Sequence, residues 1–127
     1  MAFQSTTSTP KKYFVLADSH ARFVPRLTTT PTHQIVIESI FGLKWIDDGQ
    51  HHLSAFHLFQ TSPIFSHLVS ANAVMFLIGS NSLRKFTASI VLNQIQYIIS
   101  DLRRQHPHLA NKDSIGIVTT FSRFKFS

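Results

Sequence analysis

Four short apolar runs punctuate the chain, and polar or helical stretches separate them. The runs lie near residues 13–17, 34–39, 73–78 and 114–120 and are rich in branched and aromatic residues. Runs that stay apolar without strict alternation are typical of strands covered on both faces of a sheet. The pattern therefore predicts four strands of a parallel sheet.

The clearest helix is predicted over residues 87–104. An apolar stripe at 3.6-residue spacing is formed by Val91, Ile95, Ile98 and Leu102. The polar residues expected away from that stripe are Asn93, Gln96, Ser100, Asp101 and Arg104. We expect the helix to end at His106, because a residue that precedes proline disfavours helical backbone angles.

The remaining stretches read as connections. Residues 20–27 predict a short helical turn limited by Pro25, and residues 28–32 predict a loop. Residues 53–70 are expected to be partly helical, with an interruption at Pro63. Strands that alternate with helices favour right-handed βαβ units, hence an α/β fold.

The predicted organisation is one domain over residues 13–127 that follows a flexible tail over residues 1–12. We expect a three-layer, flavodoxin-like parallel sheet with helices on both faces. The hydrophobic fraction of 43% is sufficient for a core, and the length fits one domain. We find no internal repeat and no second domain.

Composition adds a positive charge of +6 and a pI near 10.2. This excess makes nucleic acid a candidate partner, although the charges are scattered and no nucleic-acid motif accompanies them. There is no cysteine, no signal-peptide pattern, and the strongest apolar run, residues 71–78, is too short to cross a bilayer. An intracellular, cytoplasmic protein without a membrane span is expected.

Three polar signals follow predicted strands. These are Asp18-Ser19 after the first strand, Gly42 after the second, and Gly79-Ser80-Asn81 after the third. Carboxyl ends of parallel strands meet at one edge of a sheet, where active groups collect. A serine hydroxyl beside N–H and amide donors suits attack on an ester carbonyl and stabilisation of the oxyanion. Each signal taken singly also fits an ordinary role as a helix cap, turn glycine or loop cap.

The order of these signals resembles that of the SGNH (GDSL-type) hydrolases. Residues 13–20, YFVLADSH, look like the first block of that family, residues 39–42, SIFG, like the second, and residues 76–82, FLIGSNS, like the third. The resemblance implies that Ser19 is the nucleophile and that the oxyanion hole consists of Ser19, Gly42 and Asn81. It implies no cofactor, and an acyl ester as the small-molecule substrate.

The sequence departs from that family at three places. Ala17 replaces the first glycine, and Ser82 replaces an aspartate that makes a structural contact. The family's final Asp-x-x-His block is absent from the 127 residues, so the fold is expected to be incomplete at its C-terminus and the base is unknown. Two weak candidates for the base are His51, in an Asp48-x-x-His51 spacing out of family order, and His20, next to Ser19.

Metal binding is not expected, because His51, His52 and His57 have no cysteine and no ligand motif beside them. Two functions stay open. The first is a serine esterase or acyl hydrolase of low or no activity. The second is a non-catalytic interaction module, or a truncated mobile-element remnant, with a basic surface. Self-association is also expected, through an open apolar edge near Phe121, Phe124 and Phe126.

Overall fold

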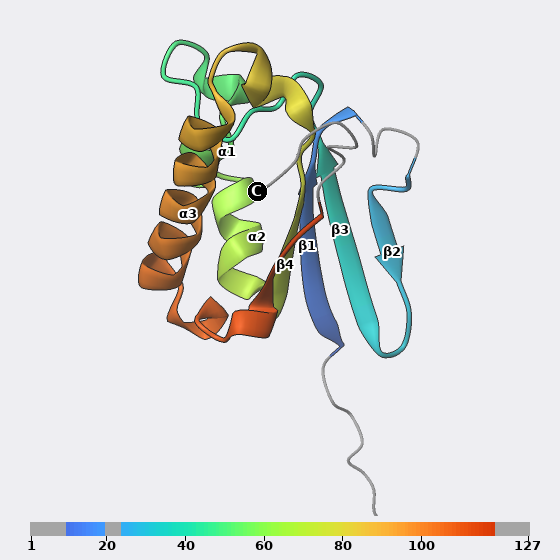
Figure 1. Cartoon of the computed structure of the whole chain (residues 1–127). Helices are drawn as coiled ribbons and strands as arrows, with labels where there is room; N and C mark the ends of the chain where they lie inside the picture. Colours follow the sequence, from blue (N-terminus) through green and yellow to red (C-terminus); the bar gives the residue numbers. More distant parts are fainter. Residues whose placement is uncertain (1–9, 20–23, 119–127) are drawn as a thin grey trace, which may run out of the picture.

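A five-stranded sheet with the order β2-β3-β1-β4-β5 is the centre of the structure (Figure 1). The structure is a computed structural model, and it describes residues 10–19 and 24–118. The strands are β1 (Lys11–Ala17), β2 (Leu27–Thr29), β3 (His33–Ser39), β4 (Ala73–Leu77) and β5 (Ile115–Ile117). Residues 119 and 120 of the fourth predicted strand lie outside the described residues, as do Phe121, Phe124, Phe126 and His20.

The predicted parallel pairing is confirmed. β1 pairs in parallel with β3 on one side and with β4 on the other, and β4 pairs in parallel with β5. β2 was not predicted and runs antiparallel to β3 at the sheet edge. The loop predicted over residues 28–32 was therefore wrong in its first half. A turn closed by the Thr30 N–H on the His33 carbonyl, at 2.8 Å, brings β-branched threonines alongside β3.

The helices are α1 (Ala55–Leu58), α2 (Ile64–Ser70) and α3 (Ala88–Gln105), with short 3-10 helices η3 (His51–Leu53), η4 (Ser80–Arg84), η5 (Pro107–Leu109) and η6 (Lys112–Ser114). Figure 1 shows α1, α2 and α3 on the same side of the sheet. A small α/β fold with a mostly parallel sheet is thus present.

The third layer is not confirmed, because no helix within residues 10–19 and 24–118 covers the other face. The connection from β1 to β3 runs in the opposite direction across the sheet from the two later crossovers. Residues 24–32 of this connection contain bends and β2, and residues 20–23 of the predicted helical turn lie outside the described residues.

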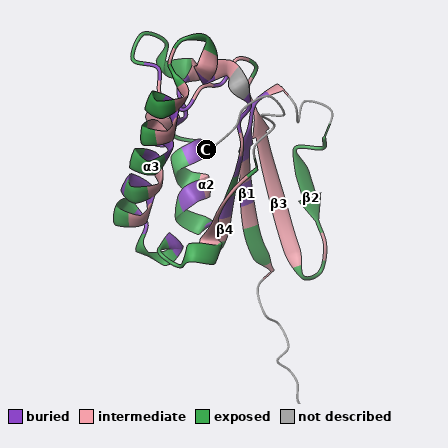
Figure 2. Cartoon of the chain, viewed as in Figure 1, coloured by how far each residue is buried: buried purple, intermediate pink, exposed green. Residues whose placement is uncertain are grey.

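The core lies between the sheet and these helices. Phe14 and Leu16 of β1 and Phe76 of β4 belong to the same buried cluster as the apolar stripe of α3. The stripe predicted for this helix is thus confirmed. The buried stripe consists of Val91, Ile95, Ile98 and Leu102. Figure 2 colours buried stretches of α3, α2 and the strands purple. α3 ends at Gln105, one residue before His106, as predicted.

Asp101 corrects one expectation for α3. It was predicted to lie away from the apolar stripe, but it is buried. Arg104 donates to one of its carboxylate oxygens and Gln105 to the other, the latter at 2.9 Å. These donors satisfy the carboxylate where it leaves water, which a pattern of polar and apolar positions does not reveal.

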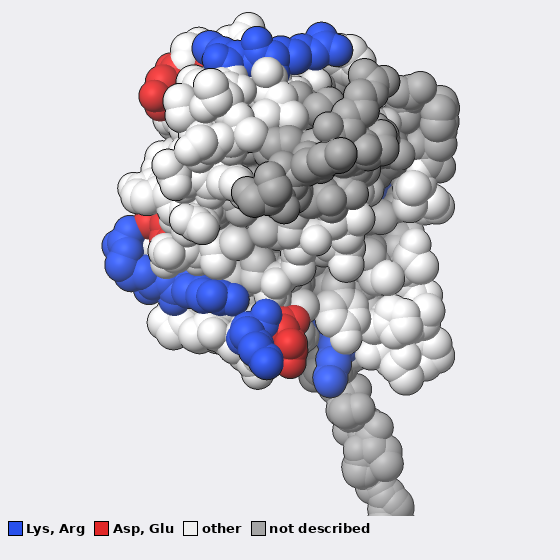
Figure 3. Space-filling model, viewed as in Figure 1, with Lys and Arg blue, Asp and Glu red and all other residues white. Residues whose placement is uncertain are grey.

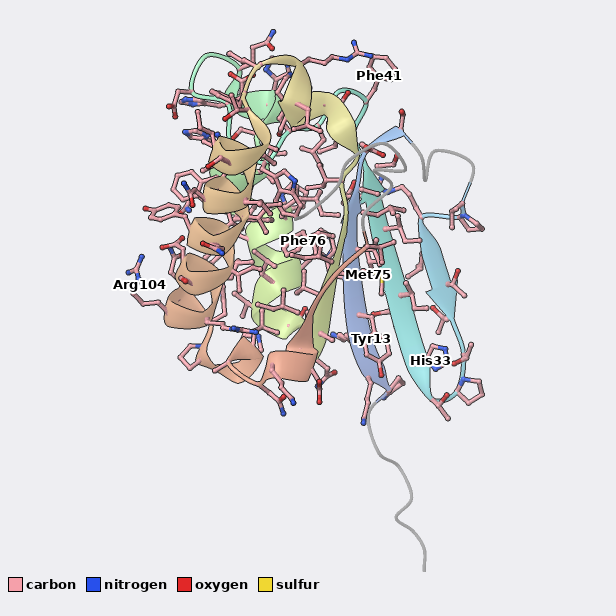
Figure 4. The ribbon with its side chains drawn as sticks, in the orientation of Figure 1. Tyr13, His33, Phe41, Met75, Phe76 and Arg104 are labelled. Atoms are coloured by element: carbon pink, nitrogen blue, oxygen red, sulfur yellow. The ribbon has the colours of Figure 1, made fainter. Side chains whose placement is uncertain are left out.

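The opposite sheet face presents Tyr13 and Val15 of β1 beside Met75 of β4. Successive side chains of a strand alternate between faces, so Met75 is 44% exposed while the neighbouring Phe76 is fully buried. Figure 4 shows Phe76 directed toward the helices and Met75 on the other side of β4. In the described part of the chain, no helix has both the length and the apolar character to cross a membrane.

Candidate functional site

The loops after β1 and β4 are held together by Asp18. Its backbone N–H donates to the Leu77 carbonyl at 3.0 Å, which extends the pairing of β1 and β4 by one residue. Its carboxylate is fully buried and accepts a hydrogen bond from the Gly79 N–H at 2.6 Å. A short hydrogen bond to a buried carboxylate fixes the position of Ser19, the next residue along the chain.

The loop after β3 joins the same site. The Ser39 hydroxyl donates to the Asp18 carbonyl at 2.8 Å, and the Ile40 N–H donates to the Ala17 carbonyl at 2.9 Å. A turn follows, closed by the Leu43 N–H on the Ile40 carbonyl at 3.3 Å. Gly42 occupies this turn with a φ of +80°, a backbone angle that favours glycine.

Residues after β4 reach back to that turn. The Asn81 amide donates to the Leu43 carbonyl at 3.1 Å. The Ser82 hydroxyl, which is buried, accepts a hydrogen bond from the Trp45 N–H at 3.0 Å. Ser82 thus links the segment after β4 to the chain that follows Gly42.

Ser19, Gly42 and Asn81 accordingly lie on loops that follow three adjacent parallel strands. Ser19 is half-buried. That the Ser19 hydroxyl and the Asn81 amide reach one common ligand stays a prediction. Phe41, in the same turn as Gly42, is 82% exposed and lies at this end of the molecule (Figure 4).

A second polar cluster lies on η3 and α1, and the sequence analysis missed it. The Ser54 hydroxyl lies 2.8 Å from Nδ1 of His57, and Nε2 of His57 lies 3.7 Å from a carboxylate oxygen of Asp48. Ser54 also accepts a hydrogen bond from the Asp47 N–H at 2.9 Å. The i, i+3 spacing of Ser54 and His57 at the start of a helix is the sequence signal for this contact.

This Ser-His-Asp order resembles that of a catalytic triad, but the serine is in the wrong environment. Ser54 is fully buried, so no substrate carbonyl can approach its hydroxyl. The contacts instead fix the ring of His57. Asp48 and His51, which the Asp48-x-x-His51 spacing suggested as a pair, both contact His57 in this cluster. Asp48 pairs with His57, while the His51 ring stacks on the His57 ring with centroids 3.7 Å apart.

Asp47 anchors the loop that leads into this cluster. Its carboxylate is fully buried, and one oxygen accepts hydrogen bonds from the N–H groups of Gly49 and Gln50 at 2.9 and 3.0 Å and from the Lys85 ammonium at 3.2 Å. The Lys44 ammonium lies 3.6 Å from the other oxygen. Burial raises the pKa of Asp47, but the bond from Lys85 and the two backbone bonds outweigh it, so the pKa lies below its ordinary value of 3.8.

Of the two candidate bases, His51 stacks on His57, and His20 lies outside the described residues. The hydrogen bonds made by the ring nitrogens of the described histidines go to Thr32, Ser54 and Leu68, and none reaches Ser19. His106 is the C-cap residue of α3, and His108 lies in η5, which follows it. No group of three or more histidines and carboxylates in the described part of the chain is arranged to hold a metal ion.

No family model matches this sequence, and no curated protein matches it significantly.

Proposed function

We propose that this chain is a serine esterase-like domain of the SGNH type, with Ser19 as its nucleophile and with slow or no ester turnover. The observation that carries the proposal is the linkage of three strand-end loops. Asp18 binds Gly79 of one loop and Ser39 of the other, while Asn81 binds back to Leu43. The parallel order of β3, β1 and β4, with crossovers through α2 and α3, supports the flavodoxin-like arrangement.

In the proposed reaction, the Ser19 hydroxyl oxygen bonds to the carbonyl carbon of an acyl ester. The carbonyl oxygen becomes an oxyanion, which the N–H groups of Ser19 and Gly42 and the amide of Asn81 stabilise. The C–O bond to the alcohol then breaks, and water releases the acid from Ser19. Phe41 offers an exposed apolar surface for the acyl group. The hydroxyl proton needs an acceptor, and general-base catalysis ordinarily contributes about 10²–10⁴-fold.

Slow turnover follows from the histidines of the described residues, since none is hydrogen-bonded to Ser19. Residual acceleration then comes from the oxyanion donors alone. His20 stays a candidate for the base and lies outside the described residues.

The test is hydrolysis of a short-chain p-nitrophenyl ester by the purified chain, beside its Ser19→Ala variant. Ser100→Ala is the matched control, because Ser100 is an exposed serine on α3. Labelling with a fluorophosphonate, followed by intact mass measurement, detects a nucleophilic serine even where turnover is slow. We expect a label that Ser19→Ala removes and Ser100→Ala retains. A chain that neither turns over ester nor takes the label would disprove the proposal.

A non-catalytic interaction module is the second candidate. The engagement of the Asn81 amide with the Leu43 carbonyl favours it, because one donor of the proposed oxyanion hole already serves to hold a loop. In that case the three linked loops form a rigid edge that presents Phe41 to a partner. Absence of the Ser19 label in a folded chain would favour this second function.

A further inference from the structure

A pocket of about 420 Å³ opens between η3 and the end of α1, apart from Ser19. It is lined by His51, His52, His57, Leu58, Gln60 and Thr61. Its walls are mainly apolar atoms, although most of these residues are polar by type. Ring faces and the side chain of Leu58 therefore provide much of the surface.

Two of the rings form a parallel stack. The ring centroids of His51 and His57 are 3.7 Å apart, and their planes differ by 9°. The His57 ring of this stack is held by its contacts with Ser54 and Asp48. The Phe56 ring meets the His57 ring edge-on, with centroids 5.3 Å apart. A ring held in this way loses little conformational freedom when a further flat group packs on the stack.

One face of the His51 ring is covered by His57, but His51 as a whole is exposed, as is His52. The remaining ring surface suits a flat π-system such as a nucleobase. Bases stack on aromatic side chains, histidine included, with little dependence on base identity. A metal ion is not the occupant that the geometry favours, since no described group of histidines and carboxylates is arranged to hold one.

Positive charge lies beside the stack. The Lys85 ammonium and the Gln50 N–H bind the same carboxylate oxygen of Asp47, and Gln50 directly precedes His51. Lys44 contacts the other oxygen, so two ammonium groups face one buried carboxylate.

Arg84, next to Lys85, is exposed and adds a further positive charge. The exposed Asp48 opposes part of this charge. Lysine and arginine side chains are visible at this end of the molecule in Figure 3. A phosphate attached to a stacked nucleoside is attracted to such a surface.

We propose that the His51–His57 stack is a platform for a base of a single-stranded nucleic acid, whose phosphates lie toward Arg84 and Lys85. The chain's net charge of +6 strengthens this association at low salt. The site does not use Ser19, so it does not depend on ester hydrolysis.

The experiment measures fluorescence anisotropy of the full chain with a labelled oligothymidylate and with an abasic oligonucleotide of the same length, at one fixed low salt concentration. The two probes carry the same phosphates, so their difference reports stacking alone. We expect the oligothymidylate to bind at least about fivefold more tightly, which is the lower end for one stacked base. An oligouridylate of equal length shows whether RNA binds as well as DNA.

His51→Ala should lower the affinity for the oligothymidylate to that for the abasic probe, while His51→Phe should retain it because the ring remains. His33→Ala is the matched control, because His33 is the first residue of β3 and does not line the pocket. Thermal melts check that each variant is folded. Equal affinity of the folded chain for both probes, or an unchanged preference in folded His51→Ala, would overturn the proposal.

Discussion

The carboxylate of Asp18 and the backbone N–H of Gly79 form a buried hydrogen bond of 2.6 Å across 61 residues of sequence. Asp18 is thus a structural residue of the candidate site, whatever Ser19 does. Its replacement leaves a buried N–H without this partner, at a cost of about 1–3 kcal/mol. We expect Asp18→Ala to lower the free energy of unfolding by that amount in urea melts. Asp113→Ala, at an exposed aspartate of η6, is the control; an equal loss in both variants would contradict the assignment.

Gly42 is expected to be required for its backbone angle. A Cβ built there meets only the Leu53 side chain, at an ordinary distance of 3.7 Å, so space is not the constraint, but φ is +80°. Gly42→Ala should therefore destabilise the fold by about 1 kcal/mol through backbone strain. Gly116→Ala is matched to it, because a Cβ at Gly116 has no neighbour within 4 Å and φ is not positive. We expect that variant to be neutral or slightly more stable in the same melts.

The fold was more accessible from the sequence than the site was. Phe14 of β1 and Phe76 of β4 are buried in the core, so the apolar runs around them were sufficient to find β1 and β4. β2 escaped because its three residues are all exposed and its pairing depends on a turn formed farther along the chain. Local composition there indicated only a loop.

Contacts that depend on three-dimensional placement escaped for the same reason. The order of Ser19, Gly42 and Asn81 on successive strands was visible in the sequence. The sequence did not reveal that Asp48 pairs with His57 and not with His51. The reason is that η3 places the His51 ring on the face of the His57 ring. Spacing alone suggested a contact between Asp48 and His51, but the backbone of η3 directs His51 to His57 instead.

Asp47 is expected to make stability depend on pH in acid. Its pKa is lower in the folded chain than the ordinary 3.8, so its contribution is present above pH 3.8 and is lost as pH falls through the folded value. Asp47→Asn keeps the shape but loses the charge that binds Lys85. We expect it to be less stable by about 1.5–3 kcal/mol at neutral pH and to show a smaller further loss below pH 3.8. Urea melts at a series of pH values measure both effects; parallel curves for the two proteins would refute this role.

His106 should act in a higher pH range. Burial lowers its pKa below the ordinary 6.5, and the nearby charge of His108 lowers it further, while Asp101 opposes the change. The unfolded chain therefore binds this proton more readily, and stability should fall as pH decreases below 6.5 toward the folded value. His106→Gln should flatten this part of the profile. His52→Gln, at an exposed histidine, should leave the slope of the wild-type curve intact.

The sheet face that carries Met75 is expected to support self-association. Tyr13, Val15 and Met75 lie on this face, and the described helices cover only the other one. Met75 is 44% exposed, although its neighbours along β4 are largely buried. Exposed apolar patches favour association. A charge introduced on this face in both copies would have to lose its hydration or lie against the same charge on the other copy. We therefore expect concentration-dependent dimers or larger species in sedimentation velocity. Met75→Lys should weaken the association constant about tenfold or more, because a cost of about 1.4 kcal/mol is tenfold in an equilibrium constant. Val69→Lys, at an exposed position of α2 on the helical side, is the matched control and should leave association unchanged. A chain that stays monomeric at every concentration, or one in which both substitutions act alike, would exclude this face as the contact.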